Sequence, residues 1–132
     1  MKFATNSTSS VNVSLSLTGG KGSNSSSAGS FAGHISTYHG DETTLNIVNS
    51  AGTGNVTITT EDPTSAVYAG GFSGILATKH SEAENSQQIV NIDNVCATGN
   101  VSGGYITGGL FGNVQANSGT VNIKNSYSTG DV

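Results

Sequence analysis

The sequence predicts an all-β fold, a right-handed parallel β-helix (β-solenoid) of about three coils of ~40 residues, with essentially no helix. A block written NIVNSAGTGNV at residues 46–56 returns as NIDNVCATGNV at 91–101 and as NIKNSYSTGDV at 122–132. A second block, AGSFAGHI, AGGFSGIL or TGGLFGNV, precedes each copy. Two blocks in the same order mean that one structural unit is used repeatedly, and the Gly, Ser, Thr and Asn around them are poor helix formers.

Short runs in which β-branched and polar residues alternate are typical of strands. The second block supplies them at 44–48, 89–92 and 120–123, and another type of strand follows at 55–59 and 100–102. In a solenoid each strand pairs in parallel with the matching strand of the next coil, about 4.8 Å along the axis. We therefore expect matching residues to form columns.

Apolar residues in matching positions define the predicted core. Its columns are Phe31, Phe72 and Leu110; Ile35, Ile75 or Leu76, and Val114; Ile47, Ile92 and Ile123; and Val56, Val101 and Val132. A β-sandwich with coincidental repeats is the alternative, but it would not explain why the same Asn positions return.

Polar residues and glycines recur at matching positions as well. The repeat columns are Gly33, Gly74 and Gly112; Asn46, Asn91 and Asn122; Asn49, Asn94 and Asn125; and Thr53, Thr98 and Thr129. Stacked Asn side chains can hydrogen-bond along a ladder, or the Asn residues can reflect the preference of turns for Asn. The pairs Gly70–Gly71 and Gly108–Gly109, with Gly99 and Gly130, are expected to supply positive φ at turns.

The repeats divide the chain into a first part, 1–27, and a solenoid, 28–132. Within the solenoid the repeats cover 28–68, 69–106 and 107–132, and we expect them to belong to a longer solenoid. Residues 11–15 resemble a strand of the second block, so 1–27 is interpreted as a degenerate first coil or cap. Its residues 1–10 and 19–27 are expected to be loop or disordered.

The composition argues against two classes of partner. Four Lys and no Arg, with a net charge of −4, give no basic face for nucleic acid. No apolar run approaches the roughly 20 residues of a membrane-spanning helix, and the first residues lack the apolar core of a secretory signal.

Cys96 is the only cysteine, which leaves no intrachain disulfide, and we expect it to be a half-buried filler.

Two acidic loops contain weak candidates for a cation site. The residues are His39, Asp41, Glu42, His80, Glu82 and Glu84. Imidazole and carboxylate groups ligate divalent cations, but Ser118 stands at the matching position of the third copy, so a solvated polar loop is the favoured interpretation. The acids lie mostly in loops, not in the flanking pairs that glycoside hydrolysis needs. We therefore predict no catalytic residues, no enzyme activity, no metal and no cofactor.

The pattern GGLFGNV followed by TVNIKNSYSTGDV resembles the GLUG repeat, which is named for a Gly-Leu-x-Gly core and is found in large bacterial surface proteins. Residues 108–112 and 125–132 match it well. The middle copy has Phe72 for Leu and Cys96 for Tyr, and the first copy is looser. The resemblance implies a parallel β-helix in a secreted or cell-surface protein, often an adhesin or an accessory region of a larger enzyme, and it carries over no catalytic residues.

These observations favour a structural or adhesive segment of a secreted or cell-surface repeat protein, which presents a rigid polar surface to glycans or proteins. One alternative is an extracellular filament subunit that stacks end to end through open β-edges. A second alternative is a non-catalytic accessory region of a glycan-active enzyme. The expected partners are further copies of the repeat or of the chain itself, paired end to end, together with glycans or cell-surface proteins.

Overall fold

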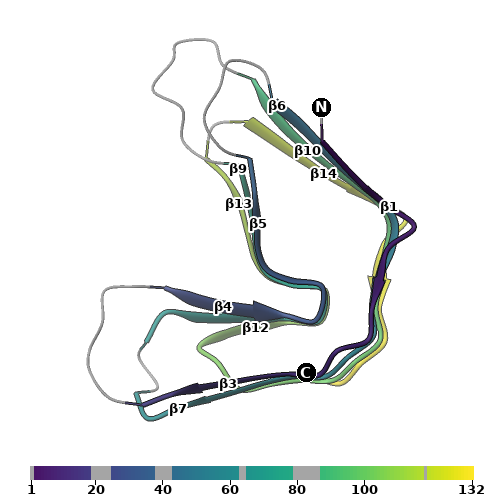
Figure 1. Ribbon diagram of the computed structural model, residues 1–132. Helices are drawn as coiled ribbons and strands as arrows, with labels where there is room; N and C mark the ends of the chain where they lie inside the picture. Colours follow the sequence, from purple (N-terminus) through teal and green to yellow (C-terminus); the bar gives the residue numbers. More distant parts are fainter. Residues whose placement is uncertain (1, 19–24, 38–42, 63–64, 79–86, 118) are drawn as a thin grey trace.

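Figure 1 shows the computed structural model, which describes residues 2–18, 25–37, 43–62, 65–78, 87–117 and 119–132. The described residues form strands and connections without a helix. The strand pairings found among them are parallel. The all-β fold that the sequence predicts is therefore confirmed, and its arrangement is solenoid-like.

The chain passes through the fold in successive rows. Row 1 contains β1 (Lys2–Thr5), β2 (Thr8–Ser9), β3 (Val13–Leu17), β4 (Ser26–Gly29) and β5 (Ala32–Ser36). Row 2 contains β6 (Thr43–Gly52), β7 (Val56–Thr60), β8 (Val67–Gly70) and β9 (Ser73–Thr78). Row 3 contains β10 (Gln88–Ala97), β11 (Val101–Ser102), β12 (Ile106–Gly108) and β13 (Phe111–Ala116), and row 4 contains β14 (Gly119–Lys124) and β15 (Tyr127–Ser128).

Matching strands of successive rows pair to form four sheets. Sheet A has the order β1-β6-β10-β14, with β2 paired to β6 and β15 to β10. Sheets B, C and D have the orders β11-β7-β3, β12-β8-β4 and β13-β9-β5. The view in Figure 1 runs nearly along the stack, so the rows superpose; sheet D lies opposite sheet A, and sheet C lies opposite sheet B.

Two apolar clusters fill the interior. The cluster between sheets A and D consists of Ile35, Ile47, Phe72, Leu76, Val90, Ile92, Val95 and Ala97. The cluster between sheets B and C consists of Ala28, Val56, Ile58, Val67, Ala69 and Val101. Where sheets C and D meet, the ring of Phe72 stacks on Phe31 with centroids 4.3 Å apart and meets Phe111 edge-on at 6.0 Å. Aromatic packing of this kind adds to the stabilisation that comes from apolar burial.

The strand register decides one choice that the sequence left open. Leu76 pairs with Ile35 and Val114, so Leu76 completes this core column. Ile75 instead pairs with His34 and forms part of the opposite face of sheet D.

A column of Asn residues turns the chain within sheet A. Asn6, Asn49, Asn94 and Asn125 have φ values of 52°, 51°, 53° and 50°. Asn tolerates this left-handed region better than most residues because its short side chain bonds locally. The Ser hydroxyl that follows three of them donates to the carbonyl group of the residue before the Asn: Ser7 to Thr5, Ser50 to Val48 and Ser126 to Lys124. The recurring Asn-Ser pair is therefore a turn motif.

The expectation of loops at residues 1–10 is wrong, because β1 and β2 lie there and pair with β6. The register places Asn6 on Asn49, and it places Asn12 on Asn55. Residues 3–13 therefore form a fourth copy of the second block, matched to residues 46–56. Its signal in the sequence is a pair of Asn residues six positions apart. The other copies have the same pair, except that Asp131 replaces the second Asn in the last copy.

The role expected for the turn glycines is also wrong. Among the described residues the glycines with positive φ are Gly103 and Gly104. Gly54, Gly99 and Gly130 are required for a different reason: a Cβ atom on them would lie 2.0, 2.1 and 2.0 Å from the carbonyl oxygen of the matching residue in the preceding row. These glycines allow two rows to approach each other closely.

Candidate functional site

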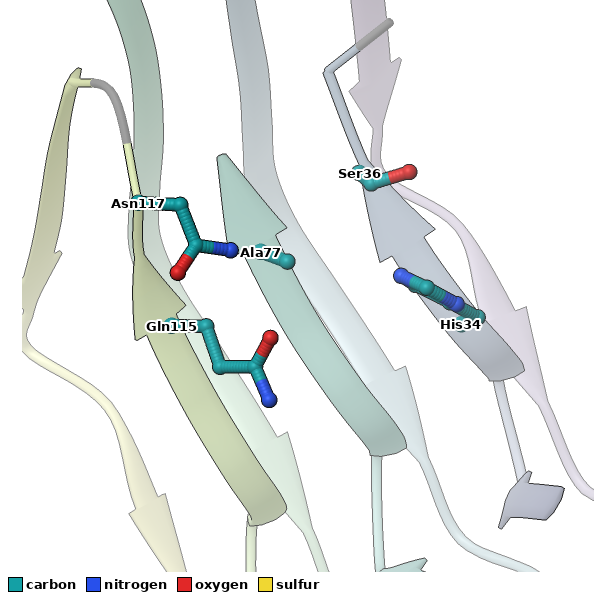
Figure 2. A pocket seen from close by; sticks show the side chains of 5 residues that line it. All are labelled: His34, Ser36, Ala77, Gln115 and Asn117. Carbon is teal, nitrogen blue, oxygen red and sulfur yellow. The ribbon is translucent and has the colours of Figure 1, made fainter. Parts of the chain in front are cut away.

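The outer face of sheet D contains a shallow depression of about 180 Å³. Its lining comes from three rows and consists of His34, Ser36, Ala77, Gln115 and Asn117. Strand alternation places His34 and Ser36 on one face of β5, and the register sets Ser36 beside Ala77 and Ala77 beside Gln115. Figure 2 shows the imidazole and the two carboxamides converging on Ala77 from opposite sides.

The lining groups can donate and accept hydrogen bonds without carrying a fixed charge. A carboxamide offers two N–H donors and an accepting oxygen. A hydroxyl group and an imidazole ring can each donate one hydrogen bond and accept another. Between these groups Ala77 supplies an apolar floor. Such a surface is suited to a ligand that is rich in hydroxyl groups and has apolar ring faces. None of the five lining residues is acidic, so they do not form the carboxylate pair of a glycosidase.

The Asn46, Asn91 and Asn122 column forms a hydrogen-bonded ladder on sheet A. The Asn91 Nδ2 donates to Asn46 Oδ1 at 2.9 Å, and the Asn122 Nδ2 donates to Asn91 Oδ1 at 2.9 Å. Asn91 therefore uses both ends of its amide. This column matches the ladder interpretation of the recurring Asn.

The neighbouring Asn column combines both interpretations. The Asn94 Nδ2 donates to Asn49 Oδ1 at 2.8 Å, while both residues hold the left-handed turn. The ladder then shifts, because the Asn125 Nδ2 donates to the Asp93 carboxylate at 2.8 Å instead of to Asn94.

A third ladder was not predicted. The backbone N–H of Asn55 donates to Asn12 Oδ1 at 2.8 Å, that of Asn100 donates to Asn55 Oδ1 at 2.9 Å, and that of Asp131 donates to Asn100 Oδ1 at 3.0 Å. Only the side-chain oxygen is used, so Asp can stand in this column, as Asp131 does. The sequence signal was the Asn or Asp that precedes the final Val of each block.

The remaining predicted columns have structural roles. A Cβ atom on Gly33, Gly74 or Gly112 would lie 2.9, 2.7 or 2.7 Å from a backbone oxygen atom where sheets C and D meet. The three Thr residues are exposed, and their backbone N–H groups donate to the preceding row: Thr53 to Ser9, Thr98 to Gly52 and Thr129 to Ala97. These columns form structure and offer no reactive group.

Cys96 is half-buried and pairs with Tyr127 in the next row. A side-chain hydrogen bond with Cys96, and the charge that the thiol can carry, raise the pKa of the exposed Tyr127 hydroxyl.

The candidate cation ligands cannot be placed. His39, Asp41 and Glu42 lie in 38–42, and His80, Glu82 and Glu84 lie in 79–86, outside the described residues. Within the part of the chain that is described, no group of three or more His, Cys, Asp or Glu could hold a metal ion.

Across the same described part, no helix is long and apolar enough to cross a membrane. Comparison with known proteins adds no identity: no family model, no curated protein and no solved structure matches this chain.

Proposed function

We propose that the chain is a structural or adhesive segment of a secreted or cell-surface repeat protein. In this proposal the solenoid is a right-handed parallel β-helix of about three coils of ~40 residues, with repeats at 28–68, 69–106 and 107–132, and it belongs to a longer solenoid. The kinship to GLUG-repeat surface proteins is part of the same proposal and rests on the two repeated blocks.

Row-to-row hydrogen bonds support the mechanical part of this proposal. The ladders through Asn91 and Asn55 tie each row to its neighbours outside the apolar core. Such ladders fix each row relative to the next, and a surface that is preorganised in this way loses less conformational entropy when it binds.

The depression over sheet D is the observation that carries the adhesive part. Its imidazole, hydroxyl and two carboxamides surround an apolar floor, which suits the hydroxyl groups and ring faces of a sugar. We assign it to glycan contact. The same contact would serve a non-catalytic accessory region of a glycan-active enzyme.

A glycan array tests this assignment. The wild-type chain is expected to bind at least one glycan, and His34→Ala and Gln115→Ala are expected to weaken that binding about tenfold each, because each removes hydrogen bonds to the ligand. Thr57→Ala, an exposed residue of sheet B, is the matched control and should bind as the wild type does. Binding to no glycan, or equal binding by all variants, would contradict the assignment.

A second candidate function, end-to-end pairing with further copies of the repeat, is favoured by a different observation. Val114 and Ile123 belong to core columns, yet they are 44% and 42% exposed. Exposed core residues beside unpaired strand edges are a template for a further layer of strands.

A further inference from the structure

The two end faces of the stack differ in what they can accept. We call the edge formed by β11 to β15 the C-terminal face, and the edge formed by β1 to β5 the N-terminal face. On the C-terminal face Val114 and Ile123 are exposed, whereas their matching residues in the preceding rows, Leu76 and Ile92, are 0% and 1% exposed. A further row stacked on this face would cover Val114 and Ile123 and remove this difference in exposed fraction.

The polar groups of the C-terminal face continue the ladders. Asn122 donates to Asn91, so its Oδ1 lies where the next amide of the ladder would donate. The Asp131 side chain occupies the position from which Asn55 and Asn100 accept a backbone N–H of the next row. The C-terminal face is therefore complementary to one more row of the same repeat, in continuity with the contact between rows 3 and 4.

The N-terminal face breaks the pattern in the glycine column. The register that pairs Ser9 with Gly52 and Val13 with Val56 places Val11 in the column of Gly54, Gly99 and Gly130. In this column a Cβ atom points at the carbonyl oxygen of the preceding row and would lie about 2 Å from it. Val11 has a Cβ atom and two methyl groups, and its side chain is 64% exposed. A row stacked beneath Val11 would collide with it.

A second position on this face also departs from the pattern. Phe3 pairs with Asn46 and so stands in the amide-ladder column. If a second copy placed its row 1 on the C-terminal face, the register would match Asn122 with a residue type that has no side-chain donor for its Oδ1.

We propose that the C-terminal face docks one further row of this repeat that carries Gly in the Val11 column, and that Val11 prevents row 1 of a second copy from being that row. In this role Val11 acts as natural edge-protecting residues do: it stops strands from pairing with another molecule. The proposal rests on the proposed stacking of repeat rows but not on glycan contact, so a silent glycan array would leave it intact.

Sedimentation velocity on three chains tests the proposal. The wild type is expected to remain a monomer, and Val11→Gly is expected to form oligomers whose mass increases with concentration. Val11→Ala is the matched control: it removes the two methyl groups but keeps the Cβ atom, so it should remain a monomer. The exposure of Val11 means that neither change removes a buried contact, and circular dichroism checks that both variants keep their β content.

Two additions fix the direction of stacking. Val11→Gly combined with Ile123→Lys should return to a monomer, because a charge then faces the docking row. An excess of wild-type chain should shorten the Val11→Gly oligomers, since a wild-type chain can accept a row on its C-terminal face but cannot offer its own row 1. The proposal would be overturned if the Val11→Gly chain stayed a monomer, or if the wild type or Val11→Ala formed oligomers. It would also be overturned if either Ile123→Lys or added wild-type chain left the Val11→Gly oligomers unchanged.

Discussion

Two neighbouring columns, one of glycines and one of asparagines, each depart from their pattern once, with different consequences. Val11 begins the column of Gly54, Gly99 and Gly130, and Asp131 ends the column of Asn12, Asn55 and Asn100. The first departure adds atoms where a carbonyl oxygen of another row must lie. The second keeps the one oxygen atom that the column uses. Whether a stacked fold tolerates a substitution is therefore set by the atoms that the new side chain meets in the adjacent row.

The largest effect is expected from a Cβ atom in the middle of the glycine column. Gly99→Ala would place that atom 2.1 Å from the Gly54 carbonyl oxygen, between two rows that cannot separate without losing core contacts. We expect the free energy of unfolding to fall by about 3 kcal/mol, as in severe overpacking. Urea denaturation measures it, with Val11→Ala as the control at an exposed position of the same column. A Gly99→Ala chain as stable as the control would contradict the proposed row spacing.

A medium effect is expected where an amide uses both of its ends. Asn91→Asp removes the donor to Asn46 and sets two accepting oxygen atoms against each other, so we expect a loss of about 2 kcal/mol. Thermal or urea unfolding at neutral pH, where the carboxyl group is ionised, gives the value.

Asn55→Asp is the matched change in the other ladder. The Asn55 side chain only accepts the Asn100 N–H, and a carboxylate accepts it equally well, so we expect a change within about 0.5 kcal/mol. Equal losses for Asn55→Asp and Asn91→Asp would show that the two ladders do not differ as described.

The smallest change in stability is expected at Asn49, where two substitutions separate the contribution of backbone conformation from that of hydrogen bonding. Asn49→Gly keeps the φ of 51° at no steric cost but loses the acceptor for the exposed Asn94 amide, so we expect a loss below about 1 kcal/mol. Asn49→Ala loses the same acceptor and also meets the left-handed strain of about 1 kcal/mol or more. If the Ala variant unfolds at the same denaturant concentration as the Gly variant, backbone strain does not explain the column.

The repeated blocks were sufficient to predict parallel strands and most core columns, because Ile47, Ile92 and Ile123 occupy the same place in three copies. They were not sufficient for row 1, where Asn6 and Asn12 survive but the apolar and glycine positions between them have changed. Leu76 and Ile75 are adjacent and both apolar, so only the register of the strands could choose between them.

The depression over sheet D was beyond sequence reasoning for a related reason. His34, Ala77 and Gln115 are chemically unlike one another and carry no repeat signal, and only the pairing of β5, β9 and β13 brings them together. The glycine column was recognised as a repeat but given the wrong role, because a sequence does not show which atom lies in front of a missing Cβ.

Amide hydrogen exchange in an Asn12→Ala chain tests most directly whether each polar column is a series of contacts between adjacent rows. The Asn55 N–H donates to Asn12 Oδ1, so its protection should fall about fivefold to tenfold, while the Asn100 N–H, which donates to Asn55, should keep its protection. Asn12→Asp, which retains the accepting oxygen, should leave both unchanged. Loss of protection at both N–H groups, or at neither, in the Asn12→Ala chain would contradict the account.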